Sequence, residues 1–339
     1  MSERLPGLGV VSEFLEVWIT VSSSVIRTQS RPPESGGRRV SAYEVEVHGR
    51  VHGRERIGNK RLGVNGVADM NDYRRGWNPM FYLEGEYSVP TNHGIEDRFL
   101  QPVLKDVRRI KSLDIDLKSI DRSSLMDAFC CGLSEADLGK KENAGALAWV
   151  KKFEKEVNEK GQPLPEVLRQ GKRPWYEMRL DKGADLVLSM NPDRRIYVAK
   201  LDGRRFVDQR LISFAKREPD ADLDLIHALL NTSLSLFLIE ASGFGRGLGV
   251  LDLTPTKLKT HLQILNPMLI PKECREVILS EFSNLKKREV LPIPEEMRSM
   301  DRHKFDSVVL ASYGLEKWGE AIRRSLEQIY AIRKSVADA

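Results

Sequence analysis

Cysteines and long apolar runs are both scarce in this sequence, and each scarcity excludes a class of protein. The chain has only three cysteines, of which Cys130 and Cys131 are adjacent and Cys274 is distant. This spacing fits neither a zinc site nor a disulfide framework, and it favours a reducing, cytoplasmic compartment. No apolar run reaches the roughly 18 residues that a membrane span requires. Glutamates interrupt the apolar segment 9–26, so it does not have the form of a signal peptide.

Recognisable catalytic motifs are missing as well. The six histidines are scattered without paired metal-ligand spacing, and no Ser/His/Asp set stands out. Asn-Pro occurs at Asn78, Asn191 and Asn266, but the second proline and the aromatic residue of an adenine N6-methylating loop do not follow. Neither Pro192-Asp193 nor Pro219-Asp220 is followed at a useful distance by the acidic-x-Lys of a nuclease signature. The sequence gives no support for catalysis by this chain alone.

The composition that remains is that of an ordinary globular protein with a modest basic excess. At 339 residues, with 41% hydrophobic and 30% charged residues, the chain is long enough to bury a sizeable core and to form two lobes. Its net charge is +5 and its sequence pI is about 9.0. A basic balance of this size is a modest argument for a nucleic-acid partner.

The chain is organised around the stretch Leu168–Phe214. It contains three runs typical of β-strands, namely Asp185–Met190, Arg195–Leu201 and Arg204–Phe214. The breaks between the runs have the chemistry of turns, and Asp202-Gly203 between two apolar runs predicts a hairpin. We therefore expect a twisted sheet in this stretch.

Positive charge is concentrated in the same stretch. Between Arg169 and Arg217 there are 13 Lys and Arg against 6 Asp and Glu, a local balance of +7. Arginine pairs flank both turns, and an arginine followed by two aromatic residues opens the stretch. A sheet with arginines at its turns is typical of a surface that binds a polyanion. The predicted DNA contacts in this stretch are Arg173, Trp175, Tyr176, Arg194, Arg195, Arg204, Arg205 and Arg210.

A second candidate loop lies at residues 73–78, between two short predicted strands. Its arginines suit phosphate, its tryptophan suits stacking on a base, and its asparagine suits adenine. The alternative is that the tryptophan covers an edge of the core and the asparagine turns the chain. We favour DNA contact, because the basic stretch downstream needs a partner surface. The predicted contacts in this loop are Arg74, Arg75, Trp77 and Asn78. For the basic segment 38–61, a solvated loop is favoured over an arm on DNA.

Apolar periodicity predicts helices through much of the chain. Trp149 lies on a core-facing stripe of its helix, so it is interpreted as packing. Asp220 and Asp222 precede a long apolar helix and are interpreted as its N-terminal cap rather than as metal ligands. The predicted helices are Ser123–Leu138, Ala144–Lys160, Leu223–Ala241, Glu273–Lys287, Met300–Tyr313 and Leu315–Val336.

The glycine-rich segment Ser242–Gly249 superficially resembles a nucleotide or S-adenosylmethionine loop. Such loops work when a strand precedes them and a helix follows, so that the helix amides face the ligand. Here a predicted helix precedes the glycines, and Val250–Leu253 is more strand-like than helical. The glycines are interpreted as ending the helix and allowing close backbone contact, although Arg246 remains a candidate for contact with phosphate.

The order of these segments resembles a known family. The stretch VADMNDYRRGWNPMFYL, the stretch KRPWYEMR and the long glycine-containing segment resemble the C-terminal, target-recognising region of N6-adenine DNA methyltransferases. These enzymes belong to bacterial and archaeal restriction–modification systems, of the type II and fused methylase–nuclease classes. The similar stretches are Val67–Leu83, Ile95–Ile110, Lys172–Arg179, Ala228–Pro267 and Arg288–Leu315.

The resemblance implies a mixed α/β fold, with a twisted β-rich recognition domain and a helical C-terminal region. We divide the chain into a poorly defined segment 1–62, a target-recognition domain 63–267 and a helical support region 268–339. In the family, the S-adenosylmethionine motif and the catalytic loop lie upstream of this region. Only about 62 residues precede it here, too few for a complete Rossmann domain. We therefore expect double-stranded DNA as a partner and a catalytic methyltransferase subunit on another chain, which would carry the S-adenosylmethionine.

Two other interpretations stay open. The first is a restriction endonuclease subunit that cleaves DNA with Mg²⁺, using catalytic residues whose spacing is not recognisable. The second is a structural protein with no role at nucleic acids. An endonuclease subunit would cleave DNA in the presence of Mg²⁺, which a recognition module would not. A structural protein would fail to bind DNA.

Overall fold

The computed structural model describes the following part of the chain: residues 80, 93–158, 161–169, 173–178, 183–208, 210–216, 221–246, 249–255, 257–258, 262 and 264–335, together with the backbone of 46–48. Its helices are α3 Glu135–Leu138, α4 Ala144–Glu154, α5 Leu164–Leu168, α6 Leu223–Leu230, α7 Ser233–Ser242, α9 Lys272–Lys286, α10 Ile293–Glu296, α11 Met300–Ala311 and α12 Gly319–Ser335. Its strands are β1 Glu46–His48, β2 Leu100–Leu104, β3 Asp114–Ile115, β4 Leu125–Phe129, β5 Ala184–Ser189, β6 Ala199–Val207, β7 Leu211–Ala215, β8 Phe244–Arg246 and β9 Val250–Asp252.

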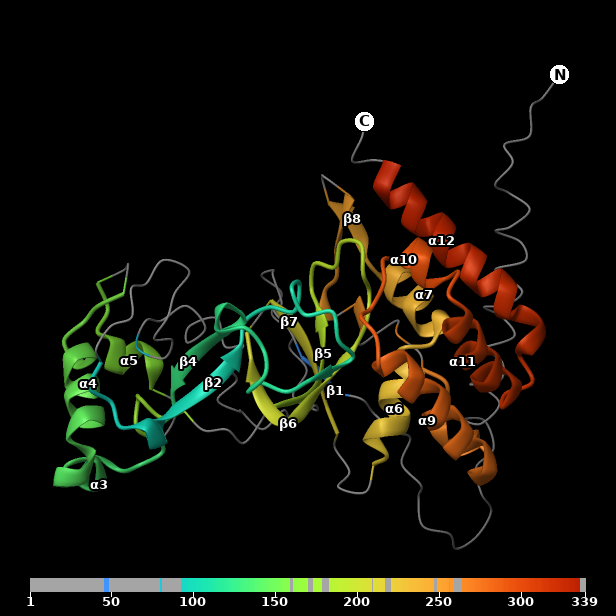
Figure 1. Cartoon of the computed structure of the whole chain (residues 1–339). Helices are drawn as coiled ribbons and strands as arrows, with labels where there is room; N and C mark the ends of the chain where they lie inside the picture. Colours follow the sequence, from blue (N-terminus) through green and yellow to red (C-terminus); the bar gives the residue numbers. More distant parts are fainter. Residues whose placement is uncertain are drawn as a thin grey trace, which may run out of the picture.

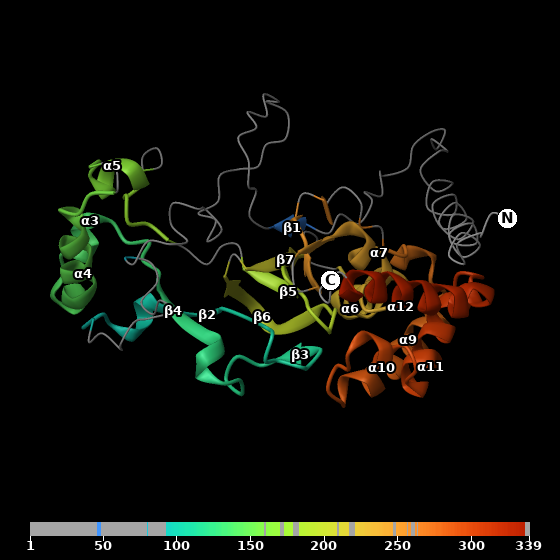
Figure 2. The same cartoon turned by 90° about the horizontal axis from the view of Figure 1, so that it is seen from above.

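A twisted mixed sheet forms the centre of the molecule, in the order β1-β7-β5-β6-β2-β4. The predicted mixed α/β fold with a helical C-terminal region is thereby confirmed. Strand β6 is the pivot of this sheet, because it pairs antiparallel with β5 on one edge and parallel with both β2 and β3 on the other. Figures 1 and 2 show α3, α4 and α5 at one end of the sheet and the C-terminal helices at the other.

The predicted hairpin at Asp202-Gly203 is wrong, because β6 runs through both residues. Ala184 pairs with Arg205 whereas Leu186 pairs with Lys200, so the extra residues of β6 form a bulge at this point. Gly203 takes a positive φ of 130°, which explains the turn-like sequence. Strand β6 ends at Val207 and β7 begins at Leu211, and both strands run antiparallel to β5, on opposite edges of it. The prediction of β5 is confirmed.

The strands β2, β4 and β6 separate two hydrophobic cores. Neighbouring residues on a strand point to opposite faces, so each strand supplies side chains to both cores. We call the part that carries α3, α4 and α5 the small lobe, and the part that carries the rest of the sheet and the C-terminal helices the large lobe. In each of the following pairs the first residue lies in the core of the small lobe and the second in that of the large lobe: Val103 and Leu104, Met126 and Leu125, Phe206 and Val207.

The small lobe corrects one prediction and confirms another. Segment Ser123–Leu138 is not one helix, because its first half forms β4 between two cores and only its last residues form α3. Trp149 of α4 is buried, as its periodic stripe predicts, and its Nε1 donates to Met80 O at 2.8 Å. Glu96 caps α4 by accepting hydrogen bonds from the backbone N–H groups of Gly145 and Ala146.

In the large lobe, the predicted helix Leu223–Ala241 is broken into α6 and α7, which are bent by 65°. Asp222 caps α6 as expected, since its side chain accepts from Leu225 N. Asp220 lies outside the described residues. The predicted helices at 273–287, 300–313 and 315–336 are confirmed as α9, α11 and α12, and they pack into the same core as the sheet.

In the described part of the chain, no single helix is long and apolar enough to cross a membrane, although α6 and α7 taken together meet the length and composition.

Candidate nucleic-acid interface

The structure places only some of the predicted DNA contacts. The loop residues Arg74, Arg75, Trp77 and Asn78 lie outside the described residues, so their predicted role is untested. Arg246 has a described backbone, in β8, where it pairs with Val250 of β9. The remaining candidates fall into two groups, one buried in the small lobe and one on the sheet.

The aromatic residues that open the basic stretch are buried. Trp175 is 5% exposed and Tyr176 is 1% exposed, and both rings lie in the core of the small lobe. The hydroxyl of Tyr176 donates to Leu133 O at 3.2 Å. Burial raises the pKa of Tyr176 to about 12. Because neither ring offers a face to solvent, we correct their interpretation: they pack rather than stack on a base. Arg173 beside them is exposed, and its Nη1 lies 3.8 Å from Glu177.

The arginines around the β6 bulge face carboxylates of the same sheet. Arg204 is paired with Asp185 at 2.9 Å and also donates to Lys216 O at 3.1 Å. Arg205 forms two hydrogen bonds of 2.9 Å with Asp202. These hydrogen bonds hold the pKa of Asp202 below its usual value.

The last arginine of the stretch is neutralised in the same way. The Nε of Arg210 lies 3.1 Å from Asp208 Oδ1, in the turn between β6 and β7. The local balance of +7 already counts the carboxylates of these pairs, so it is unchanged, but three of the arginines predicted to contact DNA each face a carboxylate. Direct contact between these arginines and DNA stays a prediction.

The turn between β5 and β6 presents a cation without such a partner. Arg194 is exposed, and within the described ranges its guanidinium forms no ion pair with a carboxylate. Arg195 is half-buried, and its Nε donates to Val290 O at 2.9 Å. The backbone of Arg194 is also fixed, since its carbonyl accepts from Ile293 N at 2.9 Å. Arg194 therefore projects from a rigid turn, and we call residues 190–195 the anchored turn.

The β8–β9 hairpin is hydrogen-bonded to the anchored turn. Leu253 N donates to Met190 O at 2.9 Å, and Leu251 N donates to Pro192 O at 3.1 Å. The side chain of Asn191 donates to Asp252 Oδ1 at 3.0 Å. These hydrogen bonds join the hairpin and the anchored turn into one unit, although the two are far apart in sequence.

A buried arginine of α12 ties this unit to the helices. The Nε of Arg333 donates to Glu240 Oε1 at 2.6 Å, and its Nη2 donates to Glu240 Oε2 at 3.2 Å and to Asp193 O at 2.9 Å. Its Nη1 also donates to the carbonyl of Gly249, within the hairpin loop. One guanidinium thus joins α7, α12, the anchored turn and the hairpin.

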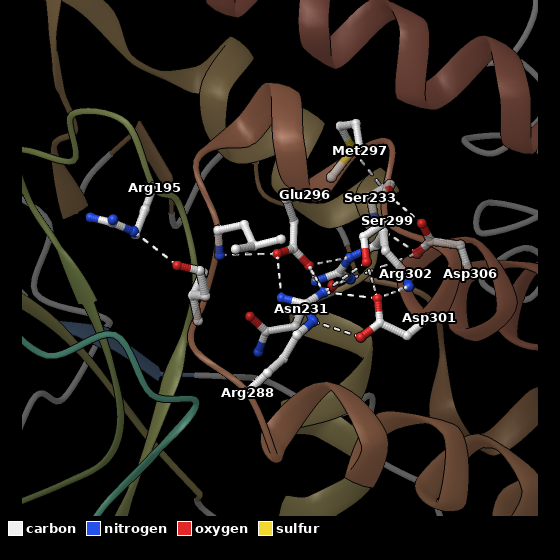
Figure 3. Close-up of polar contacts among 12 residues, drawn as sticks. Arg195, Asn231, Ser233, Arg288, Glu296, Met297, Ser299, Asp301, Arg302 and Asp306 are labelled. Atoms are coloured by element: carbon white, nitrogen blue, oxygen red, sulfur yellow. Dashed lines mark hydrogen bonds and ion pairs between the residues drawn. The ribbon is translucent and has the colours of Figure 1, made fainter.

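A second buried network supports the segment that holds the anchored turn (Figure 3). Arg288 donates to both oxygens of Glu296, at 2.8 and 3.0 Å, and Arg302 donates to Glu296 at 2.9 Å. Burial alone would raise the pKa of Glu296, but the two arginines outweigh burial and lower it. Burial alone would also raise the pKa of Asp301, but hydrogen bonds from Arg288 and Ser299 lower it to about 2.

Among the described residues, no group of three or more His, Cys, Asp or Glu side chains is placed to hold a metal ion. The anchored turn was visible in the sequence as Asn191-Pro192-Asp193 followed by two arginines. Its partners, Arg333 and Glu240, were not, because their contacts join residues that no sequence pattern relates.

No protein-family model matches the sequence, and a search of curated proteins gives no match. Among solved structures, the fold resembles part of a type IIG restriction endonuclease. That protein is BpuSI: the TM-score is 0.54, the identity is 12%, and the match covers 87% of this chain and 31% of BpuSI. The chain thus spans about a third of the length of that enzyme.

Proposed function

We propose that this chain is the DNA-binding, target-recognition part of a restriction–modification methyltransferase whose catalytic domain, carrying S-adenosylmethionine, is on another chain. The observation that carries the proposal is the likeness in fold to a type IIG restriction endonuclease over 87% of this chain. The likeness covers only 31% of that enzyme, which supports a part with one role rather than a whole enzyme.

The cations on the sheet supply a physical basis for binding. Arg194 is exposed on a rigid turn, so it meets a phosphate without a large cost in ordering. Surface pairs such as Arg205 with Asp202 contribute little to stability, so a phosphate can replace the carboxylate. Binding of this kind releases counterions, and affinity falls as salt rises.

The first experiment is titration of the purified chain with duplex DNA over a range of salt concentrations, with S-adenosylmethionine binding measured alongside. We expect salt-sensitive DNA binding and no binding of S-adenosylmethionine. Absence of DNA binding at low salt would refute the proposal. Binding of S-adenosylmethionine would show that this chain holds the cofactor itself, contrary to the proposed division of labour.

A matched pair of variants locates the binding surface. Arg194→Glu should weaken DNA binding and reduce its salt dependence, because it removes an exposed cation that pairs with no carboxylate among the described residues. Lys272→Glu on α9, an exposed position in the large lobe, serves as the control and should bind like the wild type. Equal affinities of the two variants would show that the anchored turn is not part of the DNA-binding surface.

Charge reversal at the other arginines of the stretch is a less clean test. Arg204→Glu would face the buried Asp185, and reversal of Arg195 would break its bond to Val290 O, so both changes should also lower stability. The endonuclease alternative is tested in the same assay by adding Mg²⁺. Cleavage of the duplex would refute the proposal of a recognition module and support the endonuclease.

A further inference from the structure

We infer that the β8–β9 hairpin contacts DNA directly, with the ring of Phe244 against a nucleotide and the ammonium group of Lys257 on a neighbouring phosphate. The inference rests on the proposed function and names the element that carries it out. From the sequence, the glycine-rich segment of this hairpin was interpreted as the end of a helix, with Arg246 as a candidate for contact with phosphate.

The exposure of Phe244 sets it apart from the other aromatic residues. Its side chain is 45% exposed, whereas every other aromatic side chain in the described part of the chain is buried or half-buried. An apolar ring on the surface loses the stabilisation that burial would give it, on the order of 2 kcal/mol. A ligand that covers the ring would restore this stabilisation.

A cation lies directly beside this ring. The Nζ of Lys257 is 5.0 Å from the centroid of Phe244, in the range of a cation–π contact. Lys257 belongs to a helical turn that begins at Thr254, whose Oγ1 accepts from Lys257 N at 3.4 Å. An exposed ring next to an exposed ammonium group matches the repeat of a nucleic acid, in which an apolar base or sugar face alternates with a phosphate.

The hairpin is held rigidly, which lowers the cost of binding. Gly243 at its base is pressed against Leu251 so closely that a Cβ would lie 2.6 Å from a Leu251 methyl group. Arg333 holds the far end through the Gly249 carbonyl. Figure 1 shows β8 projecting past the sheet beside the C-terminal end of α12. A preorganised projection of this kind keeps its shape when it enters a groove.

The neighbouring anchored turn extends the same surface. It is hydrogen-bonded to β9, and it presents the exposed Arg194. The hairpin, the helical turn that carries Lys257 and the anchored turn together supply one ring and two cations. Charge favours DNA over a protein partner at this surface, because neither cation pairs with a carboxylate of the described residues, and DNA supplies a phosphate at every nucleotide whereas a protein would need acidic residues placed at both positions.

The test uses the full chain and the salt titration described above. Phe244→Ala should weaken DNA binding by roughly 5- to 150-fold, the range for loss of an aromatic contact, and leave the salt dependence unchanged. Phe244→Tyr should retain affinity. Lys257→Ala should lower the slope of log K against log salt by about 1, while Lys257→Arg should keep it. Met300→Ala, an exposed apolar position on α11, is the matched control.

A second measurement covers the case in which a variant is unstable. In Phe244→Trp, the fluorescence of the introduced tryptophan should change when DNA binds. Titration of this variant with an oligonucleotide should give the same affinity as that of the wild type. If the wild type binds DNA while Phe244→Ala and Lys257→Ala bind equally well, the hairpin inference is overturned and the proposed function stands. If the wild type does not bind DNA, both are overturned.

Discussion

The side chain of Asn231 pairs with the backbone of Val198 as a neighbouring strand would. Its Nδ2 donates to Val198 O at 2.8 Å, and its Oδ1 accepts from Val198 N at 3.0 Å. The same Nδ2 donates to the carbonyl of His227 at 2.9 Å. Asn231 is fully buried at the break between α6 and α7, so these bonds satisfy polar groups that water cannot reach.

Asn231→Ala should therefore lower the free energy of unfolding by about 2 kcal/mol, because it removes the side-chain acceptor of the buried Val198 N–H and one of the two donors to the Val198 carbonyl. Urea unfolding followed by circular dichroism measures the change. Asn284→Ala, an exposed asparagine on α9, should change it by less than about 0.5 kcal/mol. Similar effects at both positions would contradict the role of the Asn231–Val198 pair.

Trp175→Ala should cost about 3–5 kcal/mol of stability, since its ring lies in the core of the small lobe. Its ring also makes an edge contact with Tyr176, with centroids 5.8 Å apart. Thermal unfolding of this variant and of Arg194→Ala separates packing from DNA contact: the first should lose stability and the second should not. A stable Trp175→Ala variant with weakened DNA binding would restore the original interpretation.

Arg302→Met should be strongly destabilising, by about 3–5 kcal/mol, because it leaves the buried Asp306 without this ion-pair partner and leaves the buried Glu296 with Arg288 as its remaining cation. Arg298→Met removes an arginine from an ion pair of 3.3 Å with Glu327, but that arginine is exposed. This control should cost less than about 1 kcal/mol. Chemical denaturation of the two variants compares a buried with a surface pair in one protein.

His227 predicts a pH dependence of stability. Burial lowers its pKa to about 4 from the ordinary value of 6.5; its Nε2 donates to Val198 O at 2.9 Å. Between pH 6.5 and pH 4 the unfolded chain takes up a proton that the folded chain does not. Stability should thus fall with falling pH in this window, by about 1.4 kcal/mol for each pH unit.

The measurement is a series of urea unfolding curves between pH 7 and pH 5 for the wild type and for His227→Gln. Carboxylates titrate in both proteins, so the difference between the two slopes reports on His227 alone. The variant should show the shallower dependence. Parallel slopes would mean that the imidazole is charged in the folded protein, as a contact with Asp114, 4.0 Å away, would favour.

Several features of the fold follow directly from local sequence. The stripe that contains Trp149, the cap at Asp222 and the β-strand run of β5 each reflect a local pattern or a hydrogen bond within a few residues, so the sequence suffices to predict them. The mixed α/β fold with a helical C-terminal region, which the resemblance to DNA methyltransferases implied, is the fold observed, and it is similar to part of a type IIG restriction endonuclease.

Other features were decided by contacts between distant residues. Asp202-Gly203 has the sequence of a turn, but pairing with β2, β3 and β5 keeps it within β6 as a bulge. The sequence of 223–241 is helical throughout, but Asn231 leaves the helix to pair with Val198.

The candidate site shows the same division. The sequence by itself determined where the arginines are and that the stretch 169–217 is basic. Only the tertiary structure decided which cations face a carboxylate, which aromatic rings are buried and which ring is exposed. The physical reason is that burial and charge pairing depend on neighbours brought together by the fold, such as Asp185 beside Arg204 and Arg333 beside Gly249.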